Sequence, residues 1–157
     1  MRRYELLSVW RVAAPLDDVW PAMLDSLAWP RWWPGLEQVR ELERGRADGL
    51  GNLRRYVWRS PLWFRLQIDM RVSAIEVRRR LTAEASGDVT GTGEWRFQTR
   101  GAETRLEYDW RVQVVRPGMR RLASWGGPLF ARSHRALMRR GARGLGRELG
   151  CRVDPEC

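Results

Sequence analysis

Apolar and polar residues alternate with a period of two over most of this chain. The clearest alternation lies between residues 64 and 73, where every second residue is apolar and the residues between them are charged or polar. This pattern is typical of a strand that buries one face and exposes the other. Further strands are predicted at residues 4–12, 39–43, 52–59, 81–85, 89–97 and 106–114, with turns between them.

Two short helices are predicted between the first strand and the rest of the strands. Pro15 stands near the first helical position of one, where its missing N–H costs nothing, and Pro21 must shorten or kink that helix. Ser26 is placed to cap a second helix, which is rich in tryptophan. The Pro-Gly pair at residues 34–35 ends this helix.

The period changes to 3.6 over residues 128–149, which predicts an amphipathic helix about 33 Å long. At 100° per residue, Phe130, His134, Leu137 and Met138 fall within an arc of about 100°. His134 is the only histidine of the chain and the one polar group on this apolar face. The glycines at positions 141, 144, 146 and 150 lower helix propensity, so we expect the far end of the helix to fray.

The order of these elements predicts an α+β fold. About seven antiparallel strands form a sheet with one apolar face, and that sheet must curve around the long C-terminal helix to bury it. A chain of 157 residues suits one domain. We expect residues 1–150 to form a single domain and residues 151–157 a C-terminal tail.

The formal net charge is +10, and all the positive charge comes from arginine because the chain has no lysine. A genome-wide codon bias explains this more simply than a function does. Between residues 116 and 152, however, ten arginines stand against one acid, Glu148, so the outer side of the last helix is a basic strip. It is either a solvated face or a weak contact for an anionic surface. Nucleic acid is disfavoured because the aromatic residues are not interleaved with the exposed arginines.

Several classes of protein are excluded by the sequence. It contains no signal-peptide core and no stretch long and apolar enough to span a membrane, so a cytoplasmic location is expected. Cys151 and Cys157 are the only cysteines and favour two free thiols. One histidine and no acidic cluster leave no basis for a metal site. Phosphate loops, dinucleotide fingerprints and serine nucleophile elbows are missing as well, and no cofactor is expected.

Five segments, in this order, carry a resemblance to a known superfamily. They are Ala14-Pro15 with Val19-Trp20, Trp29-Pro30 with Trp33-Pro34-Gly35, Gly91 to Phe97, Thr104 to Val112, and Phe130 with His134, Met138, Gly141 and Gly144-Leu145. Over nearly the whole chain they resemble the START/Bet v 1-like (SRPBCC) superfamily, and specifically its polyketide cyclase/dehydrase-like branch. The resemblance implies a helix-grip fold that holds hydrophobic ligands between sheet and helix. Some members transport lipids or sense hormones, and others close and dehydrate aromatic rings.

The inward-facing positions of the predicted strands and helices would line such a cavity. The residues expected to bind a ligand are Trp10, Trp33, Trp58, Phe64, Leu66, Met70, Trp95, Tyr108, Trp110, Phe130, His134, Leu137 and Met138. Mostly apolar walls with a few polar groups are what a small-molecule pocket requires. On the residues alone a closed core is the simpler interpretation, and the resemblance favours the cavity.

His134 and Tyr108 are the candidates for chemistry in this cavity. An imidazole can act as general acid or base, and a phenol can stabilise an enolate. The alternative for His134 is a buried neutral ring bonded to a sheet residue such as Tyr108. Because no motif fixes a second catalytic partner, a structural or ligand-contact role is preferred. Arg54 could point inward to an acidic ligand group, but the register of its strand leaves this open.

Three functions follow, in order of preference. The first is a carrier or binding protein for a hydrophobic small molecule, such as a lipid, an aromatic compound or a polyketide-like chain. The alternative is a polyketide aromatase/cyclase or dehydratase that uses the same cavity, so that the sequence leaves open whether the protein is an enzyme. The third is a surface binder whose basic helix contacts RNA, a ribosome or an anionic membrane.

Overall fold

The computed structural model describes residues 3–59, 65–116 and 127–156 of the chain. An antiparallel sheet of eight strands in the order β2-β3-β4-β5-β6-β7-β1-β8 accounts for most of them. The strands are β1 (Arg3–Val12), β2 (Leu36–Glu43), β3 (Leu53–Arg59), β4 (Arg65–Glu76), β5 (Arg80–Gly87), β6 (Val89–Arg100), β7 (Glu103–Val114) and β8 (Val153–Glu156). The predicted α+β class with a large antiparallel sheet and a long C-terminal helix is confirmed.

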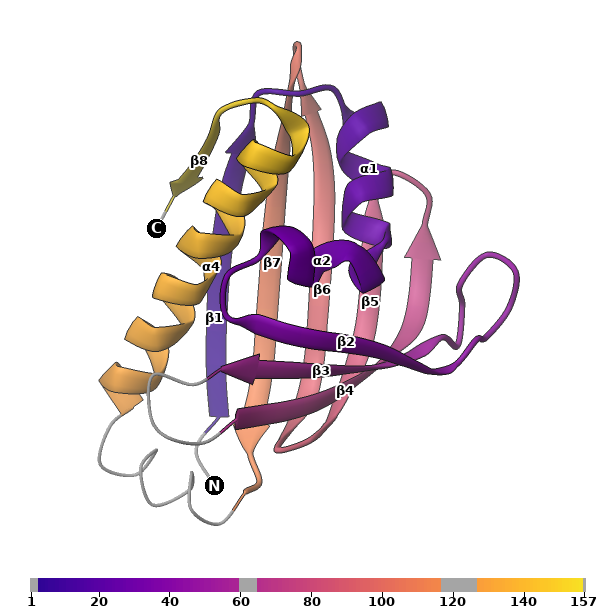
Figure 1. Ribbon diagram of the computed structural model, residues 1–157, viewed down its shortest axis with the longest axis vertical. Helices are drawn as coiled ribbons and strands as arrows, with labels where there is room; N and C mark the ends of the chain where they lie inside the picture. The colour runs from indigo at the N-terminus through magenta and orange to yellow at the C-terminus, as the bar shows by residue number, and fades with distance from the viewer. Residues whose placement is uncertain (1–2, 60–64, 117–126, 157) are drawn as a thin grey trace.

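The sheet is strongly curved. In Figure 1 the long strands β5, β6, β7 and β1 stand behind, while β2, β3 and β4 run across in front of them. The helix α4 (Gly127–Leu149) lies along β1 on the open side of this curve. The alternation gives the sheet one buried face, since Tyr4, Trp10 and Val12 of β1 are buried while Glu5 and Arg11 are exposed.

The last strand was not predicted. The chain turns at Gly150, which has a φ of 66°, and β8 then pairs with β1 from Val12↔Val153 to Val9↔Glu156. Residues 153–156 therefore belong to the sheet and are not a free tail. The segment is short and carries Pro155, so it has no alternation that a sequence pattern could reveal, although Pro155 is acceptable on an edge strand.

The helices α1 (Leu16–Leu24), η1 (Ser26–Ala28) and α2 (Trp29–Trp32) connect β1 to β2. Pro15 is the N-cap residue of α1, and Pro21 lies inside this short helix. The expectation that Ser26 caps the second helix is wrong, because the N-cap residues of η1 and α2 are Asp25 and Ala28 and no side chain caps either helix. The hydroxyl of Ser26 instead accepts hydrogen bonds from β3.

The strand β4 contains a β-bulge that changes which residues face inward. Its register against β5 shifts between Val72 and Ala74. Even-numbered residues face the helix up to Val72, and Ile75 takes over after the bulge. The alternation predicted for residues 64–73 ends at this bulge, where one extra residue reverses the faces.

The far end of α4 is the most firmly packed part of the helix. Ala142 and Leu145 are fully buried, and Gly141 and Gly144 lie against the ring of Trp33 and the main chain of Trp32. A Cβ atom at Gly144 would lie within 1.8 Å of the Trp32 carbonyl oxygen. The expectation that these glycines loosen the helix is therefore wrong, since they allow its close approach to α2.

Candidate ligand-binding site

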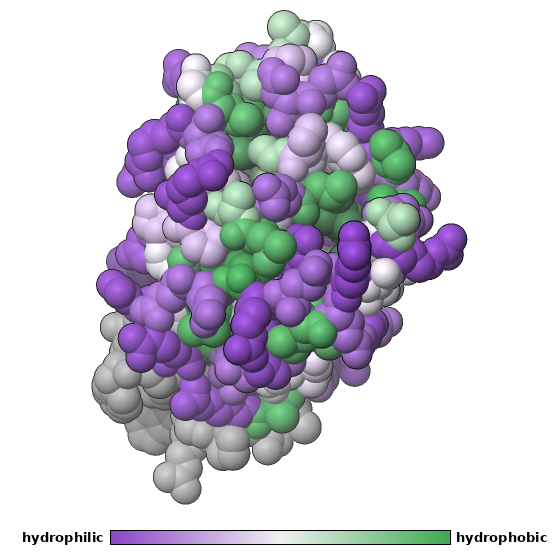
Figure 2. All heavy atoms as spheres, turned by 45° about the vertical axis from the view of Figure 1, so that its right-hand side comes forward, coloured by the Kyte–Doolittle hydropathy of each residue, from purple (hydrophilic) through white to green (hydrophobic). Residues whose placement is uncertain are grey.

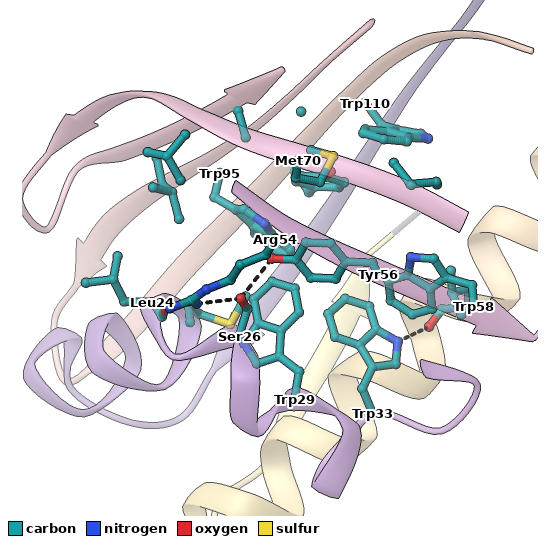
Figure 3. A pocket seen from close by; sticks show the side chains of 18 of the residues that line it. Leu24, Ser26, Trp29, Trp33, Arg54, Tyr56, Trp58, Met70, Trp95 and Trp110 are labelled. Atoms are coloured by element: carbon teal, nitrogen blue, oxygen red, sulfur yellow. Dashed lines mark hydrogen bonds between the residues drawn. The ribbon is translucent and has the colours of Figure 1, made fainter. Parts of the chain in front are cut away.

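A cavity of about 1130 Å³ lies between the concave face of the sheet, the inner face of α4 and the segment from α1 to α2. Its walls are mainly apolar and include side chains from β3 to β7. Figure 3 shows Trp29, Trp33 and Trp58 on one side and Trp95 and Trp110 on another. On the face seen in Figure 2, hydrophobic side chains gather in patches between hydrophilic ones. Buried side chains form packed clusters beside this cavity, so the core is not closed.

Three aromatic rings form a stacked wall of the cavity. The rings of Trp95 and Tyr108 are 4.3 Å apart and inclined by 30°, and those of Tyr108 and Trp110 are 5.8 Å apart and inclined by 22°. Trp95 and Tyr108 are direct partners across β6 and β7, which brings their rings together on one face. Gly93 leaves room for this stack, because a Cβ atom there would lie 2.4 Å from the Tyr108 hydroxyl. Such a wall favours contact with flat apolar groups.

A polar group of residues stands at one end of the cavity. Arg54 on β3 points inward, and its Nη1 donates to Ser26 Oγ at 2.7 Å and to the Leu24 carbonyl oxygen at 3.3 Å (Figure 3). The Tyr56 hydroxyl donates to the same Ser26 oxygen at 2.8 Å. Glu41 accepts from Arg54 Nη2 at 3.4 Å. The side chain of Arg54 is thus fixed by both the helical segment and the neighbouring strand.

His134 lies on the inner face of α4 and lines the cavity. Its Nε2 atom is buried and has no hydrogen-bond partner among the described residues. Burial lowers the pKa of His134 to about 4, because an imidazolium would lose its hydration there. The ring is neutral at pH 7, and the predicted hydrogen bond to Tyr108 is not among those that the structure describes.

Tyr108 also lines the cavity, and its hydroxyl lies beside Gly93, another lining residue. Burial raises the pKa of Tyr108 far above its ordinary value, and the nearby hydroxyl of Tyr56 and carboxylate of Asp109 add to the effect. Tyr56 behaves in the same way, since burial raises its pKa more than the contact with Ser26 lowers it. Both phenols are therefore protonated at neutral pH. Tyr56 donates its proton to Ser26, whereas the hydroxyl of Tyr108 can donate to a ligand.

A sequence profile of the family described as polyketide cyclase / dehydrase and lipid transport matches residues 8–150. The chain belongs to this family. The matched segment contains every residue that lines the cavity. No curated protein sequence matches the chain.

Solved structures with the same fold come from several organisms. A START superfamily protein from Mycobacterium smegmatis is 17% identical, with a TM-score of 0.75, and the match covers 93% of this chain and 97% of that one. The Zhui aromatase/cyclase from a Streptomyces species, strain R1128, is 19% identical, with a TM-score of 0.59 and coverage of 90% and 96%. Ginseng major latex-like protein 151 from Panax ginseng is 10% identical, with a TM-score of 0.70 and coverage of 93% and 97%. These similarities establish the START-like fold.

Most of the residues predicted for the site line the cavity in this family member. They are Trp33, Trp58, Leu66, Met70, Trp95, Tyr108, Trp110, Phe130, His134, Leu137 and Met138. Phe64 lies outside the described residues. Trp10 was misplaced: it faces inward and is 1% exposed, but the rings of Trp33 and Trp95, each about 5 Å away, separate it from the cavity. Whether any of these residues binds a ligand stays a prediction.

Sequence reasoning missed the polar end of the cavity. Ser26 was taken for a helix cap, Trp29 for a helix residue and Tyr56 for an unassigned strand residue, yet all three line the cavity. The direction of the Arg54 side chain was left open by the sequence, and in the structure this side chain points inward and lines the cavity. The alternation of Arg54, Tyr56 and Trp58 along one strand was the available signal.

The described residues form neither a metal-binding cluster nor a membrane-spanning helix. Among the described residues, no three His, Cys, Asp or Glu side chains come together as metal ligands. Of the described helices, none has the length and apolar composition needed to cross a membrane. Cys151 is a free thiol, and Cys157 lies outside the described residues.

Proposed function

We propose that this protein binds a hydrophobic small molecule in the cavity, as a carrier or binding protein. The observation that carries the proposal is the cavity of about 1130 Å³ with mainly apolar walls. Small-molecule sites commonly have volumes of about 300–1,000 Å³, so this space suits a ligand of lipid or polycyclic size. The family description, which includes lipid transport, supports the same function. The predicted cytoplasmic location fits this function and stays a prediction.

The arrangement of the walls supports an amphipathic ligand. The stack of Trp95, Tyr108 and Trp110 offers contact to flat rings or to acyl chains. At the other end, the buried Nε atom of Arg54 has no partner among the described residues and offers a hydrogen-bond donor for a ligand oxygen. A ligand with an apolar body and one oxygen-bearing end would use both parts of the cavity.

Native mass spectrometry of the purified protein tests the proposal directly, because it detects a small molecule that copurifies. Thermal-shift measurements against fatty acids, sterols, quinones and aromatic polyketides extend the test. We expect saturable stabilisation by at least one class. Absence of any bound molecule and of stabilisation by all four classes would contradict the proposal.

A matched pair of variants locates the binding site. Ala83 lines the cavity on β5, whereas Ala74 follows the bulge on β4 and does not line it. Ala83→Phe fills part of the cavity and should weaken ligand binding at least about tenfold. Ala74→Phe adds the same volume elsewhere and should leave binding unchanged. Equal effects of the two substitutions would place the ligand outside the cavity.

The second candidate is a cyclase or dehydratase that uses the same cavity. The observation in its favour is that the protonated hydroxyl of Tyr108 and the neutral ring of His134 both belong to residues lining the cavity. The first could stabilise an enolate and the second could accept a proton. If this is correct, Tyr108→Phe and His134→Gln abolish turnover of a poly-β-ketone analogue but preserve its binding. Turnover unaffected by both substitutions would reject this role for them.

A further inference from the structure

The outward side of α4 carries a row of exposed arginines, here called the arginine face. It consists of six exposed residues: Arg132, Arg135, Arg139, Arg140, Arg143 and Arg147. The only acid on the described part of α4 is Glu148, and it forms an ion pair with Arg31 of α2. The face therefore has a high positive charge over about four turns of helix.

The arginines of the sheet are arranged differently. Arg55 forms an ion pair with Asp69 at 2.8 Å, and Arg96 forms one with Glu94 at 2.6 Å. By contrast, the structure describes no ion pair for Arg135, Arg143 or Arg147. Codon bias explains why these residues are arginine rather than lysine, but it does not explain why acids accompany Arg55 and Arg96 and not Arg135, Arg143 and Arg147.

The spacing of the arginine face adds to this contrast. Arg135, Arg139, Arg143 and Arg147 follow one another at intervals of four residues, so their side chains are neighbours on the helix surface. Like charges at this spacing destabilise a helix. The helix keeps this repulsion, although a glutamate at any of the four positions would relieve it. An anionic partner that neutralises the face accounts for the arrangement.

Two kinds of large anionic partner bind arginine strips, and the exposed apolar residues distinguish them. The large hydrophobic side chains exposed in the described part of the chain are Leu7, Leu27, Val77, Val115 and Leu129. None is aromatic, so the described residues do not expose the rings on which single-stranded nucleic acid stacks. Leu129 lies on the first turn of α4, is 48% exposed and also lines the cavity. An aliphatic residue beside arginines suits a lipid bilayer.

We propose that α4 docks the protein on an anionic lipid bilayer through the arginine face. Each arginine near such a surface contributes attraction to the acidic headgroups. Leu129 and Arg132 both line the cavity, so docking brings the cavity wall next to the hydrocarbon from which an apolar ligand partitions. Docking itself needs no ligand in the cavity, and it can be measured whether or not the proposed carrier function is correct.

The experiment is sedimentation of the full chain with vesicles of phosphatidylcholine containing phosphatidylglycerol, and with vesicles of phosphatidylcholine alone. The test variant carries Arg135→Gln, Arg143→Gln and Arg147→Gln. The control carries Arg40→Gln, Arg79→Gln and Arg100→Gln, which removes the same charge from exposed arginines of β2, the β4–β5 turn and β6. Circular dichroism establishes that both variants fold.

We expect the parent protein to bind the anionic vesicles, with affinity that falls steeply as salt rises. The test variant should bind about a hundredfold more weakly, and the control within about threefold of the parent. Equal loss in the two variants would overturn the proposal, since net charge alone would then cause binding. It would also be overturned by equal binding to neutral vesicles, or by an RNA oligonucleotide that binds more tightly than the vesicles and loses affinity in the test variant.

Discussion

The indole of Trp33 donates a hydrogen bond from its Nε1 atom to the main-chain carbonyl oxygen of Leu137, 3.1 Å away. This contact fastens the end of α2 to the middle of α4. Both residues line the cavity, so the bond also fixes the position of one cavity wall against another. The ring of Trp33 occupies the space above Gly141, where a Cβ atom would lie 2.4 Å from it.

Gly141→Ala should therefore destabilise the protein. Alanine raises helix propensity by about 1 kcal/mol, but its methyl group must displace the ring of Trp33, and overpacking of this kind costs about 1–3 kcal/mol. We expect the free energy of unfolding in urea to fall, while the exposed control Arg143→Ala stays within about 0.5 kcal/mol of the parent. A variant more stable than the parent would show that the ring moves freely.

Two buried tryptophans offer a second comparison. The Nε1 atom of Trp10 is buried with no partner among the described residues, whereas that of Trp29 donates to the Ala22 carbonyl oxygen at 3.1 Å. Trp10→Phe removes an unsatisfied donor, and Trp29→Phe leaves a carbonyl oxygen unpaired. The Trp29 substitution should cost about 1–3 kcal/mol more in the free energy of unfolding, measured by denaturant titration. The reverse order would contradict the assignment of the two indoles.

Much of this architecture could be predicted because its elements bury one face only. The alternation in β4 and β7 and the 3.6 period of α4 each indicate which face is buried. The sheet, the helix and eleven cavity-lining positions could therefore be predicted from spacing. Tyr108 and His134 were placed on inward faces for this reason, and both line the cavity.

The misplaced features depend on contacts between distant segments. The side chain of Trp10 points to the predicted side of the sheet but lies behind Trp33 and Trp95. Only the packing of α2 against the sheet determines which tryptophan lines the cavity. Ser26 has the chemistry of a helix cap, yet its hydroxyl is bound by Arg54 and Tyr56 of β3. No local pattern contains such a pairing, because it joins residues that are 28 and 30 positions apart.

Arg54 and Arg55 are adjacent on β3 but differ in environment. Arg54 points into the cavity and binds Ser26 and Leu24, whereas Arg55 pairs with Asp69 on the outer face. Arg54→Met should lower the free energy of unfolding by about 1–3 kcal/mol, since it removes the charge-assisted hydrogen bonds to Ser26, Leu24 and Glu41. It should also speed amide hydrogen exchange at residues 24–26. Arg55→Met is the control, and we expect a smaller loss of stability and unchanged exchange there; equal exchange in both variants would count against the role of Arg54.

His134 should make the stability of the protein depend on pH in a way that can be isolated, because it is the only histidine. Its pKa is about 4 in the folded protein, against an ordinary value of 6.5, and burial is the cause. As the pH falls from 6.5 to 4, the unfolded chain therefore takes up the proton first, and the folded state is destabilised progressively. The stability is fully present above pH 6.5, and at most about 3 kcal/mol of it is lost near pH 4.

Urea titrations of the parent and of His134→Gln at several pH values test this dependence. Acidic side chains contribute equally to both proteins, so the difference between the two curves isolates the imidazole. We expect this difference to change by up to about 3 kcal/mol between pH 6.5 and pH 4, with the parent losing stability faster. A difference that is constant over this range would mean that the ring of His134 remains hydrated in the folded protein.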